Sequence, residues 1–350
     1  MNKILEEIMT ALNCAVFESI PDRFLDCPAE RLAELLPGPC LIDLPGREPR
    51  PLFVSVLLHG NEDTGLAAAQ EVLRRHLSRE LHRSLLLFVG NVAAAAANVR
   101  TLPAQADYNR VWPGTPTPDT PEAHMARWVF NYAAAKQAFA SIDIHNNTGL
   151  NPHYACITRL EPQFIALARL FSRTVVHFER PLGVHAGAFG RLCPAITVEC
   201  GKAGGGTGAT HAVELIEACL SMAQLPSHDV VPHDVDLFRT YAIVKVPVHA
   251  SFSFDGSPAD FRFRSDIDQL NFSELGAGES LGKIGDNGAR LMVLPGEGYD
   301  SADVYFDYRD GDIRLTQDAI PAMLTLDSSA IRQDCLCYLM HRIGVDGGRL

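Results

Sequence analysis

Short apolar runs that alternate with helical patterns constrain the fold of this chain more than any other feature. Residues 51–59 are almost continuously apolar, and residues 63–81 carry apolar side chains at helical spacing. Buried strands separated by helices are typical of a mainly parallel sheet that helices cover on both faces. We therefore expect an α/β fold with a mainly parallel or mixed sheet and helices on both faces. Its further strands are expected at 84–92, 142–145, 154–158, 174–178 and 195–200, and its further helices at 121–136, 162–173 and 210–224.

The pattern changes after Leu225, where a polar segment with prolines interrupts the helical repeats. Apolar and polar residues then alternate over 241–254, and strand-like runs follow at 289–294 and 304–308. Alternation with a period of two residues predicts strands. Residues 1–20 predict an amphipathic helix, because glutamates interrupt their apolar positions. We therefore divide the chain into an N-terminal helical segment at 1–45, an α/β domain at 46–227 and a β-rich C-terminal domain at 228–350.

Composition excludes several classes of protein. Hydrophobic residues make up 47% and charged residues 21% of the 350 residues, which is typical of a globular protein and not of a disordered chain or a coiled coil. The net charge of -12 argues against a protein that wraps nucleic acid. No run reaches the roughly 18 uninterrupted apolar residues of a membrane span. The 9 scattered cysteines suit a reducing compartment, so we expect a cytoplasmic protein without a membrane or nucleic-acid partner, and we leave a homo-oligomer open.

Two expected strand ends carry residue types that bind metals. His59 and Glu62 lie three residues apart on the turn after the run 51–59, and His145 ends another expected strand. Open α/β sheets bind their ligands at the carboxyl ends of the strands. Two imidazoles and a carboxylate are usual protein ligands of a catalytic zinc ion. We therefore interpret these residues as a metal site, with Asp143 as an outer partner of His145. For the first pair alone, a chance spacing is the alternative.

Further polar residues stand where they could serve chemistry. Glu199 ends an apolar strand, where a carboxylate is costly unless it is solvated or paired. It is either a general base or an ordinary strand end in solvent. Arg100 and Arg110 offer planar groups that grip carboxylates, with ordinary surface arginines as the alternative. The glycine-rich segment 201–208 lacks the order of a phosphate loop, so we expect a flexible loop beside the site. We interpret His153 as a polar loop residue.

Five short motifs follow one another along the chain: HGNE at 59–62, NVR at 98–100, DYNR at 107–110, DIHN at 143–146 and VECGKA at 198–203. In this order and at these intervals they resemble the succinylglutamate desuccinylase/aspartoacylase family, a branch of the zinc carboxypeptidase fold. The likeness covers about residues 50–215 and extends weakly to residues 265–272, whereas the first 45 residues have no clear counterpart.

This resemblance implies a role for each matching residue. His59, Glu62 and His145 would bind one zinc ion per chain. Glu199 would be the catalytic glutamate and Arg100 would polarise the scissile carbonyl. Asn109 and Arg110 match the pair that holds a substrate carboxylate. Related enzymes also use an arginine in the region of Arg191, so we assign Arg191 to substrate binding; His185 and Tyr299 are further candidates for the pocket.

The implied reaction is zinc-dependent hydrolysis of the amide bond of small, anionic N-acyl amino acids. Glu199 would act as general base on zinc-activated water, and zinc and Arg100 would stabilise the oxyanion. The same ligands serve carboxypeptidases, so a peptidase acting on small peptides is one alternative. A metal-binding relative without catalysis is another, although such a protein would not need Glu199 as a base.

Overall fold

The computed structural model describes residues 14–285, 288–295 and 302–349. The chain divides into two compact units. The N-terminal unit comprises Met1–Asn146, His153–Val175 and Glu179–Val235, and the C-terminal unit comprises Asn147–Pro152, Val176–Phe178 and Asp236–Leu350. Among the described residues, none of the helices is both long enough and apolar enough to cross a membrane.

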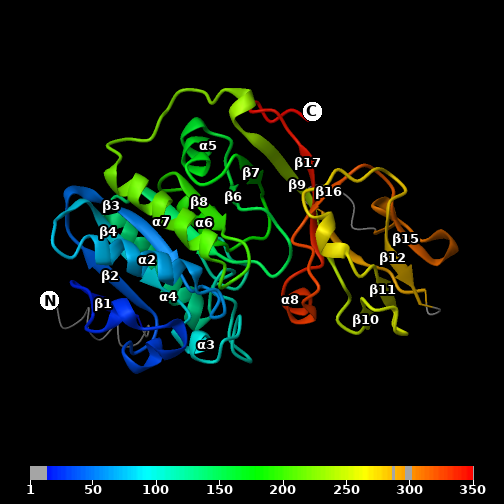
Figure 1. The fold of residues 1–350 in the computed structure, drawn as a ribbon, viewed down its shortest axis with the longest axis horizontal. Coiled ribbons are helices and arrows are strands. Elements are labelled where there is room, and N and C mark those ends of the chain that lie inside the picture. Colours follow the sequence, from blue (N-terminus) through cyan, green and yellow to red (C-terminus); the bar gives the residue numbers. More distant parts are fainter. Residues whose placement is uncertain (1–13, 286–287, 296–301, 350) are drawn as a thin grey trace. The chain divides into compact units, whose positions relative to one another are not determined.

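A mixed β-sheet forms the centre of the N-terminal unit, as predicted (Figure 1). The central strand β3 runs parallel to both of its neighbours, β4 and β5, and β5 runs parallel to β8. The apolar run that predicted β3 is buried from Pro51 to Val56. The strands in spatial order are β1 (Ala15–Phe17), β2 (Cys40–Leu44), β4 (Leu81–Val89), β3 (Gly46–Val56), β5 (Ala140–His145), β8 (Ala195–Glu199), β6 (Tyr154–Ile157) and β7 (Thr174–His177).

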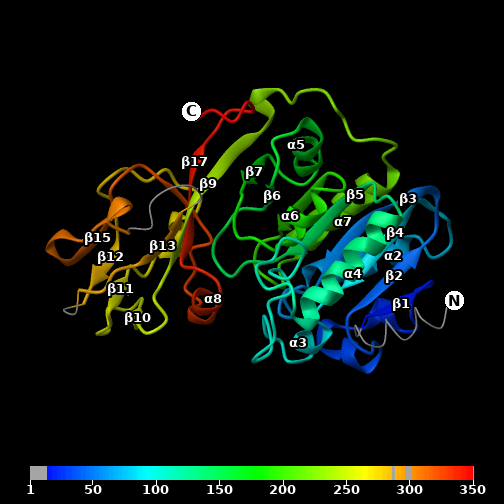
Figure 2. The same ribbon diagram turned by 180° about the vertical axis from the view of Figure 1, so that it is seen from behind.

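Helices cover both faces of this sheet. Figure 1 shows α2 and α7 in front of the strands, and the view from behind in Figure 2 shows α4 across the opposite face. The predicted start of α4 is confirmed, because the Thr120 hydroxyl accepts a hydrogen bond from the Ala123 amide, 3.2 Å away, ahead of Pro121. The helices of this unit are α2 (Thr64–Arg75), α3 (Val92–Ala96), α4 (Pro121–Ala135), α5 (Pro162–Arg169), α6 (His185–Phe189) and α7 (Gly206–Ser221).

The start of the chain differs from the expected helical segment at 1–45. Residues 1–13 lie outside the described residues, but Ala15–Phe17 form strand β1 and Cys40–Leu44 form strand β2. The only helical elements in the described part of this segment are the short 3-10 turns Phe24–Asp26 and Ala29–Glu34. The reason is tertiary: β2 lies between β1 and β4, and strand pairing overrides a local helical pattern.

The change from one unit to the other comes at Asp236, later than the boundary that we drew from the sequence at residue 228. Side chains at the end of α5 and just after it explain the difference. The Arg169 guanidinium donates to the Asp234 carboxylate at 3.0 Å, and the Arg173 guanidinium donates to the His233 carbonyl at 2.7 Å. These contacts hold the segment before Asp236 on the N-terminal unit.

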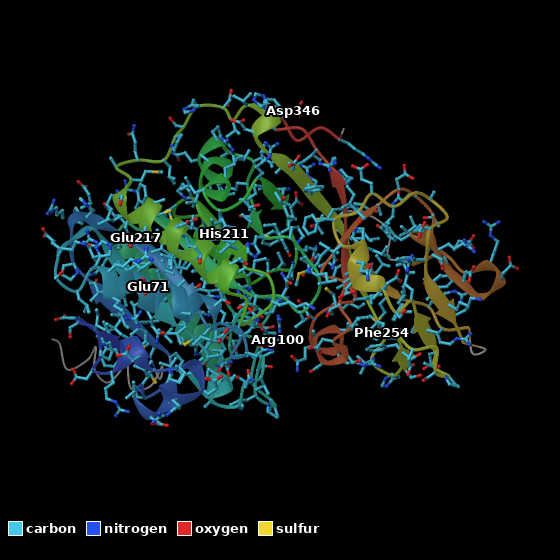
Figure 3. The ribbon with its side chains drawn as sticks, in the orientation of Figure 1. Glu71, Arg100, His211, Glu217, Phe254 and Asp346 are labelled. Carbon is cyan, nitrogen blue, oxygen red and sulfur yellow. The ribbon has the colours of Figure 1, made fainter. Side chains whose placement is uncertain are left out.

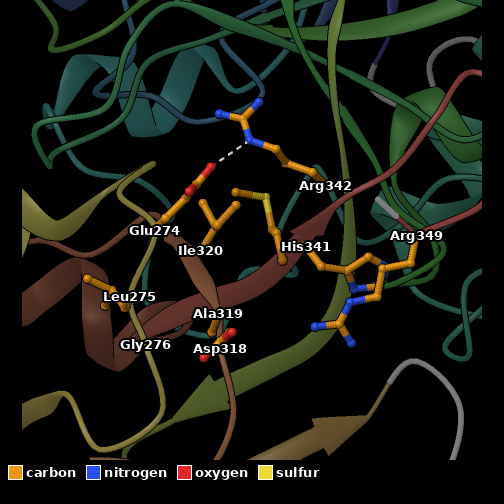
Figure 4. A pocket seen from close by; sticks show the side chains of 10 residues that line it. Glu274, Leu275, Gly276, Asp318, Ala319, Ile320, His341, Arg342 and Arg349 are labelled. Carbon is orange, nitrogen blue, oxygen red and sulfur yellow. Dashed lines mark hydrogen bonds and ion pairs between the residues drawn. The ribbon is translucent and has the colours of Figure 1, made fainter.

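The C-terminal unit is rich in β-structure, as predicted. Its core is apolar and includes Phe261, Phe306 and Leu324. A pocket of about 380 Å³ lies in this unit, where Arg342 Nε donates to Glu274 Oε1 at 2.8 Å (Figure 4). One group of strands comprises β9 (Asp236–Lys245), β13 (Met292–Pro295), β16 (Ile320–Ala322) and β17 (Cys337–Arg342), and the other comprises β10 (Phe252–Ser253), β11 (Phe261–Phe263), β12 (Ser280–Ile284), β14 (Phe306–Asp307) and β15 (Asp312–Leu315); the short helix is α8 (Ser328–Gln333).

Gly60 lies where no side chain fits. A Cβ atom added there would lie 2.2 Å from the backbone of Ala94 and Ala95, in helix α3. The Gly60 amide donates to the Arg100 carbonyl at 3.1 Å, which fixes the turn further. The backbone of α3 therefore presses directly on the turn between His59 and Glu62.

We expect Gly60→Ala to lower the free energy of unfolding by about 2 kcal/mol, because a Cβ forces backbone apart in a packed interior. Urea denaturation measures the change. Gly206→Ala is the matched control, since a Cβ at Gly206 meets no atom within 4 Å. An equal effect of both substitutions would contradict the close approach.

His185 is fully buried in an aromatic cluster of the N-terminal unit. Its ring stacks on Phe53 and Phe189, with centroids 5.5 and 4.3 Å away, and meets Trp112 edge-on. His185 Nε2 lies 3.1 Å from the Ser141 hydroxyl. Burial lowers the pKa of His185 from its ordinary value to about 4. The folded protein therefore keeps this ring neutral where the unfolded chain would protonate it.

This difference predicts a loss of stability in acid. The stabilisation is fully present above the unfolded pKa of about 6.5 and falls as the pH drops toward 4, because only the unfolded state gains the proton. Between pH 7.5 and 5 the loss from His185 is about 2 kcal/mol. In His185→Phe, which preserves the ring stacking, urea unfolding should show a smaller fall over this range. Equal falls in both proteins would exclude His185 as the source.

Candidate metal centre and active site

The register of neighbouring strands brings the candidate residues together. His145 and Glu199 are direct partners across the parallel pair β5 and β8, one at the end of each strand. The Cys200 amide donates to the His145 carbonyl at 2.9 Å and closes this end of the pair. Register partners on adjacent strands present their side chains on one face of a sheet. His145, the third candidate ligand, and Glu199, the candidate base, both predicted from the sequence, therefore lie side by side.

His59, Glu62 and His145 form a buried cluster at this edge of the sheet. Their ligand atoms lie within 4.8 Å of one another. Nδ1 of His59 lies 2.8 Å from Glu62 Oε1, and Nδ1 of His145 lies 2.7 Å from Glu62 Oε2. The Asn146 amide also donates to Glu62 Oε2, at 3.1 Å. The predicted residues thus meet in one place, and the group could hold a metal ion.

The outer nitrogens of the two histidines have carboxylate partners. Nε2 of His59 lies 3.1 Å from Asp107 Oδ1, and Nε2 of His145 lies 2.8 Å from Asp143 Oδ2. The Ser55 hydroxyl in turn donates to the Asp143 carboxylate. Outer carboxylates of this kind orient metal-binding histidines and fix the tautomer. Both Nδ1 atoms are thereby directed to the same point beside Glu62, so the donor set fits a metal ion with nitrogen and oxygen ligands.

The charges within this cluster compensate one another. Burial by itself would raise the pKa of the Glu62 carboxyl, but His59 and His145 hold it well below its ordinary value. Burial would lower the pKa of His145, whereas Asp143 and Glu62 hold it well above its ordinary value. A carboxylate that remains ionised in a buried site is a ready ligand for a cation.

Arg100 lies against the same cluster. Its guanidinium donates to Asp107 Oδ2 at 3.0 Å and lies 3.9 Å from Glu62 Oε1. The Arg100 side chain is 14% exposed, so its positive charge faces a largely desolvated region. Figure 3 labels this side chain on the N-terminal unit. A guanidinium held in this way can stabilise negative charge that develops beside the metal ligands.

Asn109 is built into the centre, and Arg110 is its neighbour. Asn109 Nδ2 lies 3.3 Å from His145 Nε2, and Asn109 Oδ1 accepts from the His185 amide at 3.0 Å. The backbone N–H of Asn109 donates to Asp107 Oδ1 at 2.7 Å. Arg110 donates to the Asn109 carbonyl at 2.8 Å. The structure therefore places the predicted Asn-Arg pair next to the histidine cluster.

The remaining candidates stand elsewhere. Arg191 is exposed, and its guanidinium lies so close to Gly114 that an added Cβ there would be 2.8 Å from it. Its role in substrate binding stays a prediction. His185 is enclosed by aromatic rings, where it supports the site through its backbone bond to Asn109. Tyr299 lies outside the described residues.

The structure also brings two residues into the candidate site that we did not assign from the sequence. Asp107 joins His59 to Arg100, and its place at the start of DYNR was the available signal. Asn146 accepts from the Thr64 amide at 3.3 Å and donates to the Gly201 carbonyl at 2.9 Å. It connects the ligand strand to the loop after Glu199. The expected loop at 201–208 is shorter than predicted, because helix α7 begins at Gly206.

Comparison with known proteins agrees with this geometry. Solved structures with the same fold include the succinylglutamate desuccinylases from Chromobacterium violaceum and Vibrio parahaemolyticus. The first is 20% identical with a TM-score of 0.57, covering 88% of this chain and 89% of its own. The second is 13% identical with a TM-score of 0.59, covering 88% and 87%. Murine aminoacylase 3 is 17% identical with a TM-score of 0.54, covering 85% of this chain and 97% of its own.

Sequence comparison places the match on the unit that holds the cluster. A search of the curated proteins finds no match. The succinylglutamate desuccinylase/aspartoacylase catalytic domain matches residues 50–225, which is half of the chain and includes His59, Glu62, His145 and Glu199. The chain therefore belongs to the succinylglutamate desuccinylase/aspartoacylase family.

Proposed function

We propose that this protein is a zinc-dependent hydrolase that cleaves the amide bond of small, anionic N-acyl amino acids. One observation carries the proposal: Glu199 lies directly across the parallel strand pair from His145, beside the buried cluster of His59, Glu62 and His145. Glu199 lies outside the group of three candidate ligands, so its carboxylate would serve as the base and not as a metal ligand. Membership of a family of deacylases supports the same reaction class.

His59 and His145 would hold the zinc ion through Nδ1, and Glu62 would hold it through its carboxylate. When bound, zinc lowers the pKa of a water molecule toward neutrality and polarises the substrate carbonyl. Asp107 and Asp143 keep the two imidazole rings in place by accepting hydrogen bonds from Nε2. The protein thus supplies a rigid set of donors before any substrate arrives.

Glu199 moves the proton in this reaction. Its carboxylate takes a proton from the attacking water and passes it to the leaving amine nitrogen. The residue is buried, with 9% of its surface exposed, which reduces competition from solvent. The Arg100 guanidinium, fixed by Asp107, stabilises the negative charge on the carbonyl oxygen. A carboxylic acid and a free amino acid are the products.

Asn109 and Arg110 supply the specificity for an anionic substrate. An amide and a guanidinium on adjacent residues can bind one carboxylate with several hydrogen bonds. The position of Asn109 beside His145 sets this carboxylate near the reacting bond. Small N-acyl amino acids with a free carboxylate satisfy this requirement.

Glu199→Gln should retain zinc and lose turnover by at least about 100-fold, because the amide cannot accept the proton. Zinc content is measured by mass spectrometry and turnover by amine release. Glu214→Gln, an exposed glutamate on α7, serves as the control and should keep full activity. Full activity of Glu199→Gln would show that another group is the base.

Arg110→Ala should reduce kcat/KM for substrates with a carboxylate by about 10- to 100-fold, the cost of one charge-assisted hydrogen-bonded contact. The panel contains N-succinylglutamate, N-succinylarginine, N-acetylaspartate and dipeptides. Arg127→Ala, an exposed arginine on α4, is the control and should leave all rates unchanged. Hydrolysis of the dipeptides alone by the unaltered protein would identify a peptidase and overturn the proposed substrate class.

A further inference from the structure

A second pair of metal-ligating side chains lies outside the candidate active site. His153 stands just before β6, and His211 stands in helix α7, where Figure 3 labels it. Their Nδ1 atoms face each other at 2.9 Å, and their rings meet edge-on with centroids 4.9 Å apart. His211 is exposed and His153 is half-buried. The pair is thus open to solvent, unlike the cluster around Glu62.

We propose that His153 and His211 bind a second divalent transition-metal ion through their Nδ1 atoms. Metal–imidazole bonds of about 2.0 to 2.1 Å place two adjacent nitrogens on one ion about 2.9 to 3.4 Å apart. The observed separation of 2.9 Å lies at the short end of that range. Imidazole is a good ligand for zinc, copper and nickel, and water can complete the coordination at an exposed site.

The surroundings hold the two rings in this arrangement. Phe171 packs against both of them, with each centroid 6.2 Å from the centroid of the phenyl ring. Gly201 lies beside His153, and a Cβ there would be 3.1 Å from His153 Nε2. Burial, and next His211, lower the pKa of His153. A neutral ring keeps its lone pair for a metal at neutral pH.

This second site has a different character from the first. It contains no carboxylate ligand, so zinc, copper and nickel are better suited to it than magnesium or calcium. It also joins two elements, because His153 precedes β6 and His211 belongs to α7. A bound ion would therefore cross-link α7 to the start of β6. The inference does not rest on the proposed hydrolase activity.

Equilibrium dialysis of the zinc-loaded full chain against micromolar Zn²⁺ tests the site, with bound metal counted by mass spectrometry. We expect the wild type to bind one ion at this site. His153→Gln and His211→Gln should each lower the affinity for that ion at least about tenfold, because each substitution removes one of the two protein ligands. His124→Gln, an exposed histidine on α4, is the matched control and should bind as the wild type does. Circular dichroism verifies that each variant is folded.

Electron paramagnetic resonance with Cu²⁺ provides a second readout. The wild type should show coupling to two imidazole nitrogens that each single variant reduces to one. Equal zinc binding by the wild type and both variants would overturn the proposal and leave a hydrogen-bonded histidine pair. The quantity compared is the ion lost on substitution, so the result is independent of whether the cluster around Glu62 binds zinc or the protein hydrolyses amides.

Discussion

The parallel pairing of β5 with β8 is the constraint on which the candidate active site depends. It sets His145 opposite Glu199, so one register fixes both a candidate metal ligand and the candidate base. A slip of one residue would send each side chain of a strand to the other face of the sheet. The same pairing aligns Asp143 with Thr197, whose hydroxyl lies 3.4 Å from the Asp143 carboxylate. The register of the sheet therefore fixes one part of the candidate site, and the segments that follow β3 and α3 supply the rest.

Charge compensation is the second requirement. Glu62 lies between two imidazoles, and each imidazole has a carboxylate on its other side. Arg100 then faces Asp107, so basic and acidic side chains alternate through a region that is largely closed to water. Removing one member of such an alternating set leaves a buried charge without its partner, which costs several kcal/mol. The arrangement is consequently stable only as a whole, although its members come from four separate segments of the chain.

Most of the site could be predicted from the sequence, but not all of the fold. His145 and Glu199 end strands β5 and β8, His59 and Glu62 lie in the turn after β3, and the positions of such strands can be predicted from apolar runs. Strand β1 was missed because it lies within the pattern that predicted a helix over residues 1–20, and strand β2 was missed although its mostly apolar run Cys40–Leu44 is largely buried between β1 and β4. Asp107 is the first residue of the DYNR motif, but its two partners, His59 and Arg100, could not be predicted because only the tertiary structure brings them together. Arg191 was assigned to substrate binding from its place in the sequence, which did not indicate that its guanidinium lies beside Gly114.

The close approach of α3 to Gly60 has a consequence for how the HGNE motif is interpreted in other chains. Its glycine is required by the helix backbone that lies against it, whereas its histidine and glutamate belong to a group that could hold a metal ion. These two demands are independent. A relative that has lost the reaction would keep the glycine as long as it keeps the helix, and would be free to change the histidine and the glutamate. The glycine thus indicates the local fold, and only the histidine and the glutamate of the motif bear on metal binding and the reaction.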